Sequence, residues 1–259
     1  MTELPLIGGV PTWYAVNGAG EPVVLLHGGL VDSRSFERAV TLLSPRYRVF
    51  TVDRRGHGRT PDMDGPYSYE LLADDTIAFL EQVVEGSAHL VGFSDGANIA
   101  LIVAARRPDL VRRLVTISGN FHHDGLLPGV LDGFADDRSI QRLASRHGEV
   151  SPDGAEHFDV VAAKDLAMAR SGPTLTTTEL AFIAVPTLVM AADDDVMPLE
   201  HTVALYRAIP DAALAIVPRT SHLLIMERPV EVYTIVDDFL SRERPIVLSP
   251  VRRAPHRNR

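Results

Sequence analysis

A chain of 259 residues, 46% of them hydrophobic, is long enough to bury one large core, so a single domain is expected. The net charge of −9 argues against nucleic acid or an anionic membrane as the main partner, because both attract basic surfaces. The absence of cysteine excludes disulfides, thiolate metal ligands and a cysteine nucleophile. It also favours a reducing, cytoplasmic location. We therefore expect a small-molecule partner, and the composition is compatible with a monomer or a homodimer.

No membrane segment is expected. Residues 1–9 carry an acidic Glu3 and no basic cluster, unlike a signal peptide or an anchor. No later segment reaches the roughly 18 consecutive apolar residues of a spanning helix.

Short apolar segments alternate with helical patterns along the chain. Helices are expected at 33–43, from Ser68 as N-cap to about residue 85, and at 97–106, 199–208 and 229–240. Strands are expected at 22–27, 47–52, 89–93, 114–117, 186–190 and 213–217, with a weaker candidate at 12–16. This alternation predicts an α/β fold, with a mainly parallel sheet covered by helices on both faces.

Residues 120–183 interrupt the alternation. They contain no strand pattern, only helical stretches at 134–145 and 157–170. Because the segment is too long for an ordinary loop, we expect a helical cap, or lid, inserted into a core formed by residues 1–119 and 184–241. The Arg-rich tail, residues 242–259, is expected to be disordered or to act as a packing arm.

A serine motif occurs between an expected strand and an expected helix. Gly92-Phe-Ser94-Asp-Gly96 is a G-x-S-x-G pattern. On a strand-to-helix turn the serine backbone is strained, and the flanking glycines let the strand and helix approach closely. This context favours a nucleophile at Ser94 over an ordinary tight turn.

A serine nucleophile needs a base, and in this architecture the chain order is nucleophile, acid, histidine. His222 follows the last expected strand and lies at the carboxyl edge of the sheet, where Ser94 is also expected. Asp193, Asp194 and Asp195 follow the preceding strand. Each is a candidate to orient His222.

Five segments resemble signatures of the α/β-hydrolase superfamily, in the same order. They are His27-Gly28-Gly29, Asp53 to Thr60, the Ser94 motif, Asp194 to Pro198, and Ser221 to Pro229. Within the superfamily the chain is similar to cap-bearing biphenyl-degradation hydrolases and valacyclovirase-like esterases. Related enzymes carry the acid four residues before a proline, in G-x-x-D-x-x-x-P, which implies Asp194. Ala191 replaces the glycine of that pattern, so Asp193 and Asp195 remain alternatives.

The resemblance implies a serine hydrolase that cleaves a carboxylic ester or a related acyl bond through an acyl-enzyme and needs no cofactor. Ser94 would attack, His222 would be its base, and Asp194 would orient the histidine. The backbone N–H groups of Gly29 and Asp95 would form the oxyanion hole. The serine argues against haloalkane dehalogenases and epoxide hydrolases, which carry an aspartate at this position.

The substrate-binding residues are harder to predict. Asp95, Phe121 and His122 are candidates, although Asp95 also suits a helix start. The His122-His123-Asp124 cluster is interpreted as non-metal, because neighbours in an extended chain point to opposite sides. Asp53, Arg55 and His57 are expected to hold a loop beside the sheet.

Other activities would use the same three catalytic residues. These are carbon-carbon bond hydrolysis, lactone or amide hydrolysis, and cofactor-independent perhydrolysis. A receptor-like protein that binds a ligand without turnover is a further alternative.

Overall fold

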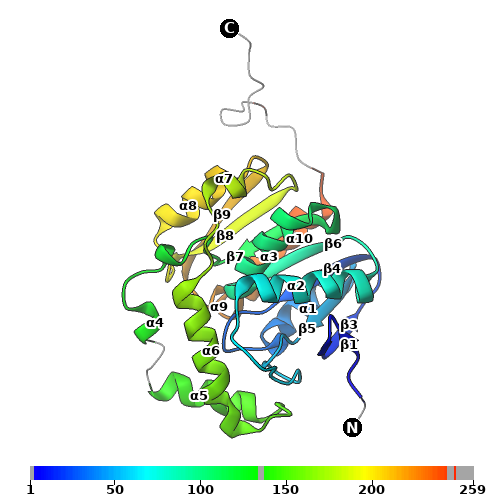
Figure 1. Ribbon diagram of the computed structural model, residues 1–259. Helices are drawn as coiled ribbons and strands as arrows, with labels where there is room; N and C mark the ends of the chain where they lie inside the picture. The colour runs from blue at the N-terminus through cyan, green and yellow to red at the C-terminus, as the bar shows by residue number, and fades with distance from the viewer. Residues whose placement is uncertain (1–2, 134–136, 244–247, 249–259) are drawn as a thin grey trace.

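Seven strands form one sheet at the centre of the molecule (Figure 1). The structure is a computed structural model that describes residues 3–133, 137–243 and 248. The strand order is β3-β5-β4-β6-β7-β8-β9; β3 pairs antiparallel with β5, and the other neighbours are parallel. The prediction of a mainly parallel sheet is therefore confirmed. The strands are β3 (Tyr14–Asn17), β4 (Glu21–Leu26), β5 (Tyr47–Val52), β6 (Ala88–Phe93), β7 (Val111–Ile117), β8 (Thr187–Asp194) and β9 (Ala212–Ser221).

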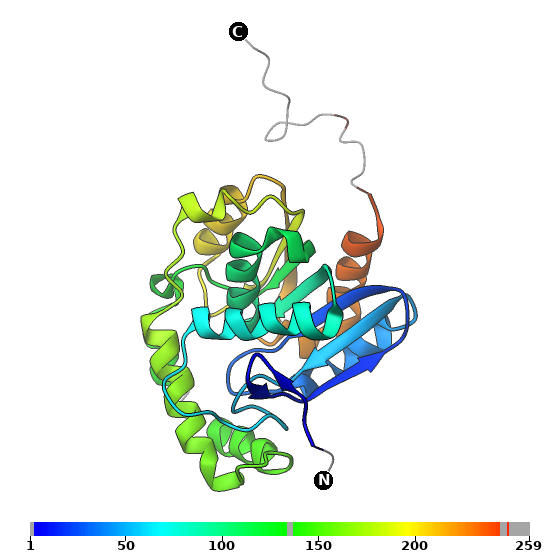
Figure 2. The same cartoon turned by 45° about the vertical axis from the view of Figure 1, so that its right-hand side comes forward.

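Helices cover both faces because strand side chains alternate between two apolar cores. In β4, Val24 and Leu26 belong to one core, and Val23 and Leu25 belong to the other. The first core is covered by α2 (Tyr69–Phe79), α3 (Asp95–Arg106) and α8 (Leu199–Ala208). The second is covered by α1 (Glu37–Leu43), α9 (Leu224–Glu227) and α10 (Pro229–Ser241). In Figures 1 and 2, α2 and α3 lie on the side of the sheet nearer the viewer.

Local sequence signals predict where most of the helices begin. Ser68 caps α2, because its side chain accepts the Leu71 N–H at 3.1 Å. The expected helix at 33–43 begins as a 3₁₀ turn, Ser33–Phe36, and continues as α1. Two short strands, β1 (Leu6–Ile7) and β2 (Val10–Pro11), were not predicted, since two residues are too few to show a period.

The segment between β7 and β8, called here the insertion (residues 120–183), is helical in its described part. It contains α4 (Val130–Gly133), α5 (Asp137–Gly148), α6 (Phe158–Ser171) and α7 (Thr177–Leu180). Both ribbon views place α5 and α6 beside the sheet rather than within its helix layers (Figures 1 and 2). Phe158 and Met168 of α6 are buried, each with 2% of its surface exposed. Phe134, part of a predicted helix, lies outside the described residues, as does the tail except for Arg242, Glu243 and Leu248.

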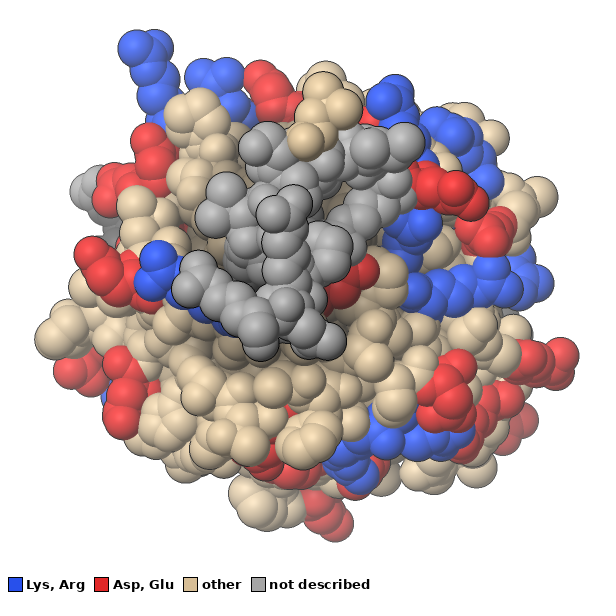
Figure 3. All heavy atoms as spheres, turned by 90° about the horizontal axis from the view of Figure 1, so that it is seen from above, with Lys and Arg blue, Asp and Glu red and all other residues tan. Residues whose placement is uncertain are grey.

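On the face in Figure 3, basic and acidic side chains are interspersed around uncharged areas. Among the described residues, every helix is too short or too polar to cross a bilayer.

Candidate active site

Ser94 occupies the turn between β6 and α3 with a strained backbone, at φ 53° and ψ −122°. The turn is tight enough to require glycine on both sides. A Cβ atom at Gly92 would collide with the backbone of Gly96, and one at Gly96 would collide with the backbone of Leu26. Glycine is therefore required at both positions for steric reasons, as the sequence pattern predicts.

Three side chains form a hydrogen-bonded chain at this turn. The Ser94 Oγ lies 3.0 Å from His222 Nε2, and His222 Nδ1 lies 2.8 Å from Asp195 Oδ1. A carboxylate only accepts, so the proton on the ring is at Nδ1. Nε2 is then free to accept the serine proton.

Asp195, rather than Asp194, faces His222, so the prediction of Asp194 is wrong. β8 extends through Asp194, which still pairs with Ser221 of β9 and is exposed. Asp193 accepts the Thr220 N–H at 3.0 Å. The strand register shifts between Ala192 and Asp194, and the next residue, Asp195, turns its fully buried carboxylate toward the histidine.

The surroundings of Asp195 favour its charged form. Burial by itself raises the pKa of the carboxyl, but hydrogen bonds and charge from His222 more than offset this, and its pKa is lowered. The Ser118 hydroxyl and the Ala192 N–H also donate to Oδ2. A negative carboxylate at this position stabilises an imidazolium at His222.

Two backbone N–H groups are candidates to bind an oxyanion beside Ser94. Asp95 begins α3, and N–H groups in the first turn of a helix have no partner within the helix. On the other side, a Cβ atom at Gly28 would lie 3.2 Å from the Ser94 Cβ, so the Gly28-Gly29 loop lies directly against the serine. The positions predicted for the oxyanion hole therefore flank the nucleophile.

His27 holds that loop from the core side. Its Nε2 accepts the Arg54 N–H at 3.1 Å, so Nδ1 carries the proton and donates to the Gly28 carbonyl oxygen at 2.8 Å. Arg54 also donates from its side chain to the same carbonyl, at 2.8 Å. Burial, with the nearby positive charge of Arg54, holds the pKa of His27 well below its usual value, which keeps the ring neutral.

Known proteins resemble this chain over most of its length. Residues 23–235 match the alpha/beta hydrolase family. The chain belongs to this family. It is 28% identical to the 2-hydroxy-6-oxo-6-(2'-aminophenyl)hexa-2,4-dienoic acid hydrolase of Metapseudomonas resinovorans, over 92% of this chain and 90% of the relative. It is 27% identical to a putative non-heme chloroperoxidase of Synechocystis sp., over 89% and 95%. The meta-cleavage product hydrolase of Pseudomonas fluorescens IP01 superimposes with a TM-score of 0.77 at 22% identity, covering 93% of this chain and 97% of that chain.

The resemblance to the superfamily is thus confirmed, and the protein is an alpha/beta hydrolase that acts on small molecules. The names of its relatives differ in the reaction, since one is a hydrolase and another a putative chloroperoxidase.

Two carboxylates lie beside the Gly29 loop of this hydrolase, that of the partly buried Asp95 and that of the buried Asp165. Asp95, a predicted substrate-binding residue, accepts a hydrogen bond from the Tyr69 hydroxyl at 2.7 Å. Burial raises the pKa of Asp95, and the negative charge of Asp165 adds to that effect, although Arg54 opposes it. A Cβ atom at Gly29 would lie 2.5 Å from Asp95 Oδ2 and 3.5 Å from Asp165 Oδ2. Both carboxylates therefore approach the loop that carries a candidate oxyanion donor.

Asp165 was not singled out from the sequence. It lies on α6 of the insertion, where the buried positions are Phe158, Val161, Ala162, Asp165 and Met168. This spacing is that of one helix face, so the carboxylate interrupts an apolar face. A charged residue on a predicted apolar helix face was the sequence signal that could have identified Asp165, because a buried carboxylate requires partners.

The other two predicted substrate-binding residues have packing partners. Phe121 stacks on His201 of α8, with ring centroids 4.2 Å apart. His122 stacks on His123, with centroids 4.5 Å apart, and accepts the Asp124 N–H at Nδ1. Their roles in substrate binding stay predictions.

The side chains of His122, His123 and Asp124 lie together, so the prediction that they point to opposite sides is wrong. The chain turns at His123 into a 3₁₀ helix, so the side chains do not alternate. One ligand atom from each of the three lies within 4.8 Å of the others. Asp124 is 78% exposed, however, and His122 Nδ1 already accepts a backbone hydrogen bond, so this geometry does not favour a bound ion.

Of the three residues expected to hold a loop, Asp53 and Arg55 have the expected kind of partner. Asp53 accepts the N–H groups of Ser33 and Arg59, each at 2.9 Å. Arg55 forms an ion pair with Asp75 at 2.7 Å. His57 instead reaches the insertion, through Asp165.

Proposed function

We propose that this hydrolase cleaves a carboxylic ester, or a related acyl bond of a small molecule, through an acyl-enzyme on Ser94. The observation that carries the proposal is the hydrogen-bonded chain from Ser94 through His222 to Asp195. A weak hydroxyl nucleophile is activated by a base in hydrogen-bond reach, and the base is oriented by a third group. The strained turn at Ser94 and the flanking N–H groups of Gly29 and Asp95 support the same role.

The reaction would proceed in two steps. His222 Nε2 accepts the Ser94 proton as Oγ attacks the carbonyl carbon, and the buried Asp195 carboxylate stabilises the resulting imidazolium. The N–H groups of Gly29 and Asp95 would bind the tetrahedral oxyanion. The imidazolium then protonates the leaving alcohol. In the second step His222 deprotonates a water molecule that attacks the acyl carbon, and it returns this proton to Ser94 Oγ as the acyl–Oγ bond breaks. The insertion (residues 120–183) would act as the cap that selects the acyl group.

Carbon-carbon bond hydrolysis is the second candidate. The name of the Metapseudomonas relative supports it, because that enzyme is a hydrolase of a 2-hydroxy-6-oxo-dienoic acid, which contains a ketone and no ester bond. Lactone hydrolysis, perhydrolysis and ligand binding without turnover would use the same site. A panel of aryl esters, lactones and 2-hydroxy-6-oxo-dienoates, measured as kcat/KM, distinguishes these alternatives.

Replacement of Ser94 by alanine tests the nucleophile. We expect Ser94→Ala to reduce turnover of a p-nitrophenyl ester by about 10⁴-fold or more, because the covalent route is removed. A fluorophosphonate probe should label the wild-type chain at Ser94 and should not label the variant.

Ser171→Ala is a control for labelling, since Ser171 is an exposed serine whose hydroxyl donates to backbone carbonyls of its own helix. Labelling at a residue other than Ser94, or full turnover in Ser94→Ala, would contradict the proposal. Stoichiometric ligand binding without repeated product release would favour the receptor alternative.

A further inference from the structure

The loop that carries Gly29 is held by the insertion as well as by the core. On the core side, His27 and Arg54 bind the Gly28 carbonyl, and Asp53 accepts the Ser33 N–H. On the other side, the Leu30 N–H donates to Asp165 Oδ2 of α6 at 2.9 Å. Residues 27–33, called here the oxyanion loop, therefore lie between two separate parts of the chain.

The contact with Asp165 falls next to the amide that the reaction would use. Leu30 follows Gly29 directly and has a left-handed backbone, at φ 59°. This conformation is unfavourable for a side chain such as leucine, and surrounding contacts must maintain it. The hydrogen bond from Leu30 to Asp165 is such a contact, and it fixes the peptide one residue beyond the candidate donor.

Asp165 is itself tightly held. Its side chain is 4% exposed, and Oδ2 lies 2.8 Å from His57 Nε2. The other ring nitrogen of His57 lies 2.9 Å from the Arg55 carbonyl, so both ring nitrogens face oxygen atoms. Burial raises the pKa of Asp165, but the charges of His57 and Arg54 reverse this, and its pKa is lowered. A charged carboxylate is a strong acceptor for the Leu30 N–H.

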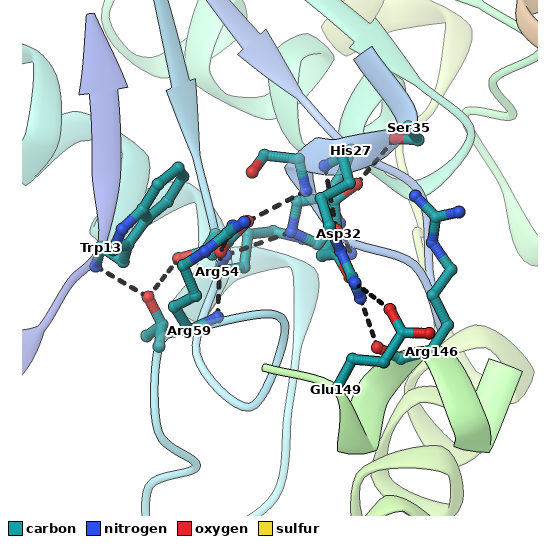
Figure 4. Close-up of polar contacts among 12 residues, drawn as sticks. Trp13, His27, Asp32, Ser35, Arg54, Arg59, Arg146 and Glu149 are labelled. Atoms are coloured by element: carbon teal, nitrogen blue, oxygen red, sulfur yellow. Dashed lines mark hydrogen bonds and ion pairs between the residues drawn. The ribbon is translucent and has the colours of Figure 1, made fainter. Parts of the chain in front are cut away.

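A second contact joins the insertion to the residue just after the loop. Arg34 forms an ion pair with Glu149 at 2.6 Å and donates to the Arg146 carbonyl. Figure 4 shows Glu149 and Arg146 beside Asp32 of the loop, with Arg54 beside His27 on the core side. Because Glu149 is 61% exposed, this outer contact is weaker than the buried one at Asp165.

We propose that Asp165 is a positioning residue of the insertion, which fixes the oxyanion loop so that the Gly29 N–H points at the oxyanion formed on Ser94. The inference rests on the proposed function. Asp165 acts through Leu30 and does not touch the substrate. Full catalytic activity then requires contact between α6 and the oxyanion loop.

The Oδ1 atom of Asp165 supports a role beyond packing. It is buried and without a hydrogen-bond partner, although Oδ2 has two. Burying a polar oxygen without a partner costs free energy, so packing alone does not explain a carboxylate at this position. The contacts of Oδ2 with the Leu30 N–H and His57 explain why a carboxylate occupies an otherwise apolar helix face.

The test compares Asp165→Ala, Asp165→Asn and the control Asp159→Ala. Asp159 is an exposed aspartate on the same helix. The readouts are kcat and KM for p-nitrophenyl acetate, and the inhibition constant of an aryl trifluoromethyl ketone, whose adduct with Ser94 carries an oxyanion. Active sites are counted by end-point titration with a fluorophosphonate, so that unfolded chains do not enter the rates.

Loss of a whole oxyanion donor costs about 10²- to 10³-fold, so a misplaced donor in Asp165→Ala should lower kcat per site by about 10- to 100-fold. The inhibition constant should rise by a similar factor, with KM within about threefold. Asp165→Asn keeps an acceptor for the Leu30 N–H and should recover most of this loss. Asp159→Ala should match the wild type.

A merely structural role predicts a different pattern, in which fewer sites are titrated but each site has normal kcat and inhibition. That result would overturn the inference. If Asp165→Ala does not fold, Asp165→Leu, which has a similar volume and no acceptor for the Leu30 N–H, takes its place. A higher inhibition constant than that of Asp165→Asn supports the inference, and equal values overturn it. Failure of the wild type to turn over any acyl substrate would overturn the proposed function instead.

Discussion

At the scale of single residues, the direction of one carboxylate determines the chemistry. Asp193, Asp194 and Asp195 are adjacent, yet Asp193 is bound to the backbone at Thr220, Asp194 is exposed, and only Asp195 is buried against His222. A carboxylate in that position selects the histidine tautomer in which Nε2 can accept the Ser94 proton. The neighbouring acids cannot replace it without moving the backbone.

Asparagine variants at the two adjacent positions test this difference. Asp195→Asn should lower kcat by about 10³- to 10⁴-fold, because the amide favours the wrong tautomer and no longer stabilises the imidazolium. Asp194→Asn should stay within about twofold of the wild type. Steady-state kinetics with one ester measures both, and equal losses in the two variants would contradict the assignment.

At the scale of elements, the start of the insertion is attached to α8 by a neutral histidine. His201 Nε2 accepts the Phe121 N–H at 3.3 Å, and the two rings stack. Burial, together with the charge of His122, lowers the pKa of His201 to about 4. Protonation would remove the acceptor, so the attachment requires the neutral ring.

This lowered pKa makes stability depend on pH. Since the unfolded chain binds the His201 proton near pH 6.5 and the folded chain only near 4, the folded state loses stability as pH falls through that interval. Between pH 7 and 5 the loss from His201 should be about 2 kcal/mol. In His201→Phe, which keeps a ring on Phe121, that part of the loss should vanish. Urea unfolding of both proteins at the two pH values measures the difference, and identical pH dependence would exclude His201 as its source.

At the scale of the whole molecule, polar contacts join the insertion to the core. Asp62 of the core accepts from Lys164 Nζ at 2.7 Å and lies 2.8 Å from His157 Nε2, both in the insertion. Burial raises the pKa of Asp62, but these partners and the Tyr67 hydroxyl lower it to about 2. The contact of Asp165 with His57 adds a buried link between the same two parts.

Removal of the Asp62 charge should loosen the insertion. Because the folded pKa is below the unfolded value of 3.8, the stabilisation is present above pH 3.8 and is lost as pH falls toward 2. We expect Asp62→Asn to cost on the order of 1 to 2 kcal/mol at pH 7, and the difference from the wild type to shrink below pH 4. Urea unfolding gives the free energies, and hydrogen exchange of α6 shows whether the loss is local to the insertion. A difference that is unchanged at pH 3 would contradict this origin.

The sequence by itself determined the features that depend on neighbouring residues. Apolar runs separated by helical patterns predicted the parallel sheet, and the spacing of Gly92 and Gly96 predicted the turn at Ser94, because both patterns act through local backbone sterics. The position of His222 after the last strand followed from the order of the elements.

Only the tertiary structure decided which acid meets the histidine and what the insertion touches. Asp194 and Asp195 are chemically identical, and a shift in strand register, together with the residue at which β8 ends, determines which one is buried. Asp165 meets Leu30 across 135 residues, and no local pattern specifies that partner. Side-chain direction and long-range contact arise from packing of the whole chain, so they become visible only after the elements have been assembled.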